Sequence, residues 1–363
     1  MKYSTLNFNL SRMMVLIMVA FMFPALASAA RQSEKVTLVF DIDQGFGNGI
    51  VVHCDKLAVN RIAKALEPLK KTYKVCALVN PMVAYREKFT SILDVLVKND
   101  LPFVFDVYTS DAQTLGSCST QNKPYDPRHG VTISLSDLQA FKKRYKKHLA
   151  GLRFTEVFSQ DFTVRAVKTT NPEWALPCWK LPDDAFFQPQ IAKDFLRFAK
   201  DNKMFVQWSD WHWFEFAGWD ALQKEHEAKL STILCEFPGL VIVTYANNEP
   251  SENSVPRLNN WEKSITRFIK GAAAGCGLSD QSWLRKNDIT CPVDDIIKWA
   301  QSALEKDCRF IQFEPAWYFF KLPRGTFGVE DYVSDPKWAD RGKGTEDFEQ
   351  LSKVLLELSA KGT

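Results

Sequence analysis

The sequence is short of histidine, of glycine and proline, and of an excess of charge of either sign. Only five of its 363 residues are His, and 16 Gly with 17 Pro are too few for a low-complexity chain. With 46 Lys or Arg against 43 Asp or Glu, a net charge of +3 gives no electrostatic reason to expect nucleic acid as a partner. At 46% apolar and 25% charged residues, the composition is that of an ordinary globular protein.

Several catalytic signatures are missing as well. The sequence has no CxxC pair and no Cys/His cluster with zinc spacing. Metal-dependent barrel hydrolases need a His-x-His pair near their first strand, and only His212 stands near the end of an expected strand. The GxSxG turn and the Walker loop do not occur, and the glycine-rich segment 45–49 lacks dinucleotide spacing. We therefore expect neither a metal ion nor a cofactor.

The first 29 residues have the pattern of an export signal. Lys2 and Arg12 precede an apolar run over residues 13–26, and Ala27-Ser28-Ala29 supplies the small residues that a signal peptidase recognises. An uncleaved membrane anchor is the alternative, but the run is shorter than the roughly 20 residues that span a bilayer and contains Pro24. We expect a signal peptide over residues 1–29 and a secreted or periplasmic protein that has no membrane contact after cleavage.

Eight cysteines are compatible with export, because an even number in an exported chain permits disulfide bonds. Two pairs lie in or near expected loops and are the preferred bridges, Cys118–Cys178 and Cys276–Cys291. A buried free thiol is an equally good interpretation of three others, Cys76, Cys235 and Cys308.

Short apolar runs alternate eight times with segments of helical spacing. Apolar runs without strict alternation are typical of parallel strands that are buried on both faces. Eight strand–helix units over about 330 residues predict an α/β fold, a (β/α)8 barrel forming one domain over residues 30–363. An open doubly wound sheet is the alternative. The expected strands are 36–43, 74–80, 102–108, 154–160, 205–210, 239–247, 275–280 and 309–315. The expected helices are 55–72, 84–99, one starting at a capping box of Ser136 and Gln139, 188–203, 220–236, 257–274, 293–307 and 345–360.

Carboxylates stand near the carboxyl end of nearly every expected strand. A buried strand should end without charge unless the charge has a partner or a task. A ring of acids at one end of a barrel suits general acid/base catalysis on a neutral polar substrate, although helix caps and loop anchors explain single members equally well. The set comprises Asp41, Asp43, Asp106, Glu156 or Asp161, Asp210, Glu249, Asp280 and Glu314.

Two of these acids stand in a suggestive local sequence. Asn247-Asn248-Glu249-Pro250 follows an apolar strand, and Glu314 ends the last expected strand. This arrangement resembles the barrel glycoside hydrolases, in which such an Asn contacts a sugar hydroxyl beside the cleaved bond and such a Glu is the acid/base. The resemblance implies that Glu249 and Glu314 are the catalytic pair, with Asp210 and Asp161 as substitutes. It departs in position: those enzymes carry the two glutamates on strands four and seven, whereas here they follow strands six and eight.

Aromatic residues accompany the acids in the expected loops. Indole rings stack on the C–H faces of sugars, while Asp, Asn and His bind sugar hydroxyls; packing of the barrel and its loops is the alternative for most of them. The residues expected to bind carbohydrate are Asp41, Asp43, Asn247, Asn248, Trp208, Trp211, His212, Trp283 and Trp317.

These observations predict a glycoside hydrolase that cleaves an oligo- or polysaccharide. A carbohydrate-binding barrel without catalytic activity is the second hypothesis, since the same aromatic residues would serve it. A minor third is an aspartate-dependent phosphatase, because Asp41-Ile42-Asp43 resembles the Asp-x-Asp of the haloacid dehalogenase type. The expected partner is a carbohydrate, and the oligomeric state is left open.

Overall fold

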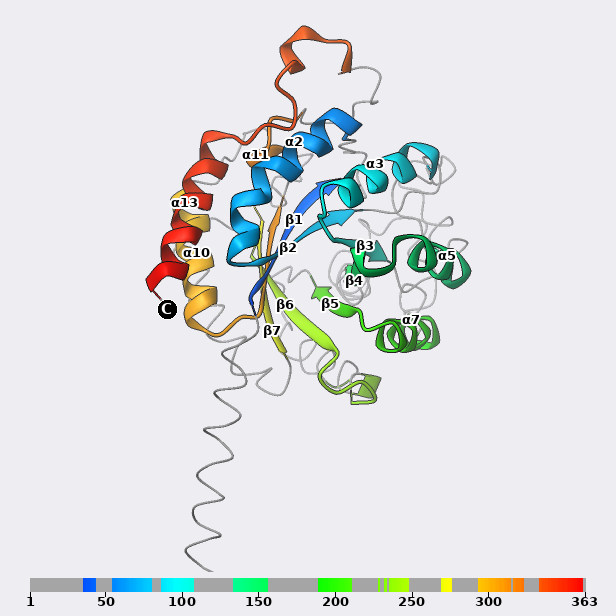
Figure 1. Cartoon of the computed structure of the whole chain (residues 1–363). Coiled ribbons are helices and arrows are strands. Elements are labelled where there is room, and N and C mark those ends of the chain that lie inside the picture. The colour runs from blue at the N-terminus through cyan, green and yellow to red at the C-terminus, as the bar shows by residue number, and fades with distance from the viewer. Residues whose placement is uncertain are drawn as a thin grey trace, which may run out of the picture. The chain divides into compact units, whose positions relative to one another are not determined.

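Eight parallel strands close into a barrel in the computed structural model (Figure 1). Each strand pairs with its neighbours in the sequence, and the last pairs with the first. The strands are β1 (Thr37–Asp43), β2 (Lys74–Val79), β3 (Phe103–Val107), β4 (Leu149–Thr155), β5 (Phe205–Asp210), β6 (Val241–Asn247), β7 (Ile269–Gly275) and β8 (Phe310–Glu314). This topology confirms the (β/α)8 barrel and excludes the open sheet.

The structure describes only part of the chain. The chain divides into two compact units, Met1–Val36 and Thr37–Thr363, and the second unit contains the barrel. Among the described residues, no helix is both long and apolar enough to span a membrane. The described residues are 35–43, 54–79, 86–107, 133–155, 189–210, 228, 232–233, 235–247, 269–275, 293–314, 316–322 and 333–361. The expected signal peptide lies outside them.

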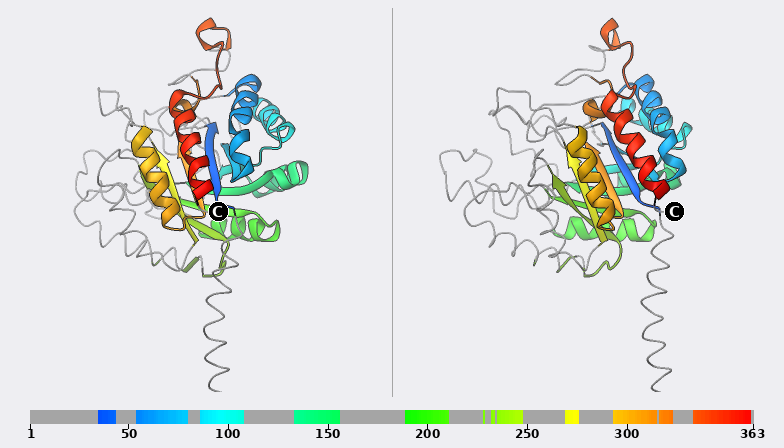
Figure 2. Two further views of the ribbon diagram at one scale, coloured as in Figure 1. Left: turned by 60° about the vertical axis from the view of Figure 1, so that its left-hand side comes forward. Right: turned by 90° about the vertical axis from the view of Figure 1, so that its left-hand side faces the viewer.

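Helices surround the barrel because each has one apolar face. Figure 2 shows α10 and α13 side by side over the strands. In α2 the buried residues Ala58, Val59, Ile62 and Leu66 recur at helical spacing, and the Asp55 carboxylate caps the helix by accepting the Ala58 N–H at 2.8 Å. The main helices are α2 (Lys56–Leu66), α3 (Arg86–Lys98), α5 (Leu135–Tyr145), α7 (Pro189–Asp201), α10 (Val293–Glu305) and α13 (Glu346–Lys361).

Three helices end in the same tight turn before the next strand begins. A residue just after each helix has a positive φ, and the following buried residue donates its N–H to a carbonyl of the last helical turn. After α7, for example, Lys203 has φ 52° and the Met204 N–H reaches the Ala199 carbonyl at 2.9 Å. Asp100 after α3 and Asp307 after α10 occupy equivalent positions. The connections at the amino end of the barrel are therefore short.

Aromatic rings cover the seam where the barrel closes. Phe40 of β1 and Phe313 of β8 are register partners, and their stacked rings have centroids 4.9 Å apart. Phe319, in the short helix α11 (Ala316–Phe319), packs against both rings, and Phe348 of α13 lies 5.8 Å from Phe40. All four rings are buried, so the closing strand pair is covered by apolar surface.

Two strands differ from the expectation, and both are displaced toward the amino terminus. β4 spans Leu149–Thr155 instead of 154–160, and β7 spans Ile269–Gly275 instead of 275–280, so the expected helix over 257–274 is wrong for its last six residues. Both segments contain small residues that suggest a turn or a helix when they are considered locally. In β4 the small residue leaves space for a neighbouring ring, because a Cβ at Gly151 would lie 2.6 Å from the ring of Phe205.

One helix start and the cysteines also differ in detail from the expectations. The capping side chain of α5 is Ser134, which accepts the Asp137 N–H, and not Ser136. Four cysteines are described: Cys54, Cys76 and Cys308 are buried, and Cys235 is exposed. The two preferred disulfide pairs lie outside the described residues, as does most of the helix expected over 220–236.

Candidate functional site

A hydrogen bond across the barrel identifies the side chains that face its interior. Gln207 of β5 donates from Nε2 to Oε1 of Gln312 in β8, and these strands are not neighbours. Both side chains therefore point inward. Register partners in a parallel sheet share a face, so Arg153 and Ile242 beside Gln207, and Val39 beside Gln312, also face the interior.

The interior contains a polar layer stacked on an apolar one. Six polar side chains point inward at or beyond the middle of their strands, and all are at most 8% exposed. Two residues earlier, on the same face of the same strands, the residues are apolar or glycine. The polar layer consists of Asp41, Asp106, Arg153, Gln207, Thr244 and Gln312. The residues below it are Val39, Val104, Gly151, Phe205, Ile242 and Phe310.

Charge in the polar layer is partly compensated inside the layer. Nε of Arg153 lies 4.0 Å from Oδ1 of Asp106, and both side chains are nearly inaccessible to solvent. Thr244 donates its hydroxyl to the Trp208 carbonyl at 3.2 Å. Removing charges from water is costly unless they are paired, so the ion pair offsets part of the cost of burying both groups.

Gln207 retains a free acceptor in this layer. Its Oε1 atom is buried and accepts no hydrogen bond from the described residues, although its Nε2 atom is bonded to Gln312. A buried acceptor without a partner costs roughly 1–3 kcal/mol. A hydroxyl group of a ligand above the layer could satisfy such an atom.

Four of the predicted site residues end strands at the carboxyl end of the barrel, called the mouth below. They are the last residues of β1, β5, β6 and β8 respectively, namely Asp43, Asp210, Asn247 and Glu314. Asp41 belongs to the polar layer and is 1% exposed. The backbone thus brings the predicted residues to one end of the barrel, which is where the active sites of such barrels lie.

Two predicted aromatic residues are described, and they differ in burial. Trp208 belongs to β5 and is 1% exposed. Its ring contacts that of Phe154, and the Phe154 ring contacts that of Phe195 in α7. Trp208 therefore packs between strand and helix, which is the alternative left open for these aromatic residues. Trp317 is only partly buried and lies in α11, directly after β8.

The remaining predicted residues lie outside the described part of the chain. They are Glu249, Asp161, Asn248, Trp211, His212 and Trp283. β7 ends at Gly275, five residues before Asp280, which also lies outside the described residues. In the described ranges, no group of three or more His, Cys, Asp or Glu side chains is placed to hold a metal ion.

Sequence reasoning missed Arg153, Gln207 and Gln312. A signal was present, because Gln207 and Gln312 are single polar residues inside apolar runs, FVQWSD and FIQFE. A polar residue in the middle of a strand that is buried on both faces needs a partner inside the barrel. For these two residues, that partner is the other glutamine.

Comparisons with known proteins find a likeness in the barrel fold alone. No protein-family model and no curated protein matches the chain. An endo-1,4-β-xylanase from Caldicellulosiruptor owensensis has a TM-score of 0.47 at 10% identity, over 89% of this chain and 98% of that one. A trimodular GH5_4 subfamily endoglucanase has a TM-score of 0.47 at 10% identity, over 90% and 61%. Orotidine 5′-monophosphate decarboxylase from Methanocaldococcus jannaschii has a TM-score of 0.40 at 11% identity, over 89% of this chain and 98% of that one. Such likenesses include barrels of unrelated activity and assign none to this chain.

Proposed function

We propose that the chain is a glycoside hydrolase whose active site is the mouth of the barrel. The observation that supports this most strongly is the buried polar layer directly below the mouth. Two carboxylates, a guanidinium group and two amides occupy positions that apolar side chains would fill at lower cost. Such a departure from an apolar core is expected at a functional site.

Glu314 is the proposed carboxylate of β8. It follows Gln312 by two residues and is the register partner of Gly275. Because strand residues two apart share a face of the sheet, Glu314 has the same register position as Gln312, one layer nearer the mouth. Asp210 follows Trp208 by two residues, and Trp208 packs on the helix side. The same relation therefore favours Glu314 over Asp210 as a catalytic group.

Glu249 is the proposed partner of Glu314. It comes two residues after Asn247, which ends β6, and β6 and β8 both pair with β7. Glycoside hydrolysis requires two carboxyl groups on either side of the bond that is cleaved, one as acid and one as nucleophile or base. Asp161 and Asp210 are the substitutes, and the substrate is an oligo- or polysaccharide. We also propose that residues 1–29 direct the protein to a secreted or periplasmic location.

Substitution of the two glutamates tests the catalytic assignment. Glu314→Gln and Glu249→Gln should each lower the release of reducing sugar from a panel of xylan, glucan and mannan by roughly 100-fold or more, because each removes a proton-transfer or nucleophilic group. The matched control is Glu357→Gln, which changes an exposed residue of α13. Unchanged rates in both variants, with melting temperatures equal to that of the parent protein, would reject the pair.

A carbohydrate-binding barrel without catalytic activity is the second candidate. The observation in its favour is the Gln207–Gln312 pair, because amides bind hydroxyl groups and transfer no protons. Calorimetric titration and a hydrolysis assay on the same oligosaccharides separate the two functions. Binding without turnover supports the second candidate, whereas turnover that disappears in Glu314→Gln supports the first.

A further inference from the structure

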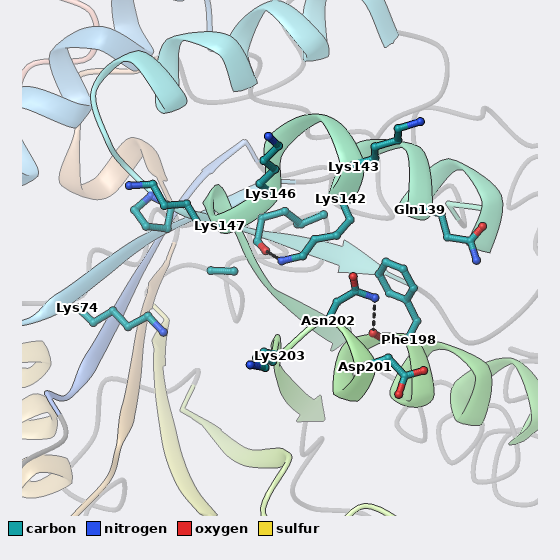
Figure 3. A pocket seen from close by; sticks show the side chains of 13 residues that line it. Lys74, Gln139, Lys142, Lys143, Lys146, Lys147, Phe198, Asp201, Asn202 and Lys203 are labelled. Carbon is teal, nitrogen blue, oxygen red and sulfur yellow. Dashed lines mark hydrogen bonds between the residues drawn. The ribbon is translucent and has the colours of Figure 1, made fainter.

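A hollow of about 870 Å³ lies at the amino end of the barrel, opposite the mouth (Figure 3). Its lining includes Lys74 and Leu149, which begin β2 and β4, and Lys203 in the turn before β5. α5, α7 and the residues directly after these helices contribute the rest of the lining, apart from Pro102 and Ala150. None of the residues proposed for the mouth belongs to this hollow.

The lining is strongly basic although the chain as a whole is nearly neutral. Among the described residues, six lysines and one acidic residue, Asp201, line the hollow. The charge comes from separate segments, so it is more than the polar face of one helix. The lysines are Lys74 of β2, Lys142 and Lys143 of α5, Lys146 and Lys147 just after it, and Lys203 after α7.

Three of the lysines are already engaged within the protein. Lys142 donates to the Leu149 carbonyl at 2.8 Å, and burial lowers its pKa. Lys147 lies 3.4 Å from the Asp100 carboxylate. The ammonium group of Lys74 lies 5.2 Å from the ring centroid of Phe205.

The other three lysines have no such contact. No hydrogen bond or ion pair joins the side chain of Lys143, Lys146 or Lys203 to another described residue, and all three are exposed. Figure 3 shows their ammonium groups at separate points around the rim, and not converging on one centre. A single small anion would reach one of them, whereas a ligand with several spaced negative charges would reach all three.

We propose that this hollow binds an acidic polysaccharide, a sugar chain with carboxylate or sulfate groups at intervals. The neutral lining residues favour a sugar backbone, because Gln139 and Asn202 carry amides that can bind hydroxyl groups. Asp201 can accept a hydrogen bond from a sugar hydroxyl.

Nucleic acid fits this lining less well. Recognition of single strands relies on several aromatic side chains on which successive bases stack, and the described part of the lining has one, Phe198. The proposal does not depend on activity at the mouth, since it concerns the opposite end of the barrel.

Charge reversal at the three unengaged lysines tests the proposal on the full chain. The variant Lys143→Glu/Lys146→Glu/Lys203→Glu is compared with Lys56→Glu/Lys64→Glu/Lys353→Glu, which makes the same change in net charge on exposed residues of α2 and α13. Affinity for polygalacturonate is measured by calorimetry at low and moderate salt. Neutral dextran and single-stranded DNA serve as further probes, and circular dichroism monitors folding.

The expected result is salt-dependent binding of polygalacturonate that falls at least about tenfold in the hollow variant and less than about twofold in the control variant. Dextran should not bind at this site. Equal losses in the two variants would show that net charge alone is responsible and would overturn the proposal. So would tighter binding of DNA than of polygalacturonate, or no binding of polygalacturonate by the parent protein.

Discussion

Replacing Gly151 by Ala tests how the interior of the barrel is packed. A Cβ at this position would lie 2.6 Å from one carbon of the Phe205 ring and 2.8 Å from two others. Carbon atoms in contact are normally about 3.5–4.0 Å apart, so the ring has to move by about 1 Å. Its surroundings resist this, because the Phe310 ring centroid is 5.7 Å away and the Lys74 ammonium group lies over the ring. We expect Gly151→Ala to lower the free energy of unfolding by about 1–3 kcal/mol.

A double-mutant cycle attributes that loss to the ring. Phe205→Leu removes ring carbons that the new methyl group would strike, so Gly151→Ala should cost less than about 0.5 kcal/mol in the Phe205→Leu background. Urea unfolding, followed by circular dichroism with unchanged slope, measures all four free energies. The reasoning is refuted if Gly151→Ala is harmless alone, or if its cost is the same with and without the Phe205 ring.

Two further predictions concern the outer shell and the thiols. Gly342 has φ +81°, and a Cβ there would lie 2.5 Å from the α-carbon of Ala58 in α2. Gly342→Ala should therefore lower the free energy of unfolding by at least about 2 kcal/mol. An unchanged melting temperature would contradict this close approach. Burial raises the pKa of Cys76 to about 12, whereas Cys235 is exposed. At about pH 8 a maleimide should therefore modify Cys235 in the native protein and Cys76 only after unfolding, as peptide mass spectrometry can determine; early labelling of Cys76 would show that it is accessible.

Local sequence was sufficient to predict strands that consist of large apolar residues. β1 and β8 were located to within a residue at each end, because Leu38, Phe40, Ile311 and Phe313 are buried whichever face they occupy. β4 and β7 were misplaced because both contain small residues, which do not indicate a strand when they are considered locally. Gly151 is small because Phe205 fills the adjacent space, and this relation appears only when β4 and β5 are paired.

The candidate site shows the same division between local and non-local information. That acids end the strands could be predicted from the sequence, and Asp41 and Asp106 are indeed at the carboxyl half of their strands. Which face of the sheet a strand residue occupies could not be predicted from the sequence, because the face depends on how the sheet curves. For this reason Trp208 was expected in the site and packs against Phe154, while Gln207, its neighbour in the chain, is inside.

β1 pairs with β8 through Thr37 and Phe310, and this pairing affects the order in which the barrel can fold during synthesis. The first strand emerges early in synthesis, but the partner for one of its edges is among the last segments to be made. Until then both β1 and β7 present unsatisfied backbone groups, which are templates for association with other copies. A chain truncated before β8 should therefore not persist as a smaller folded protein, but as an unfinished sheet that aggregates or is degraded.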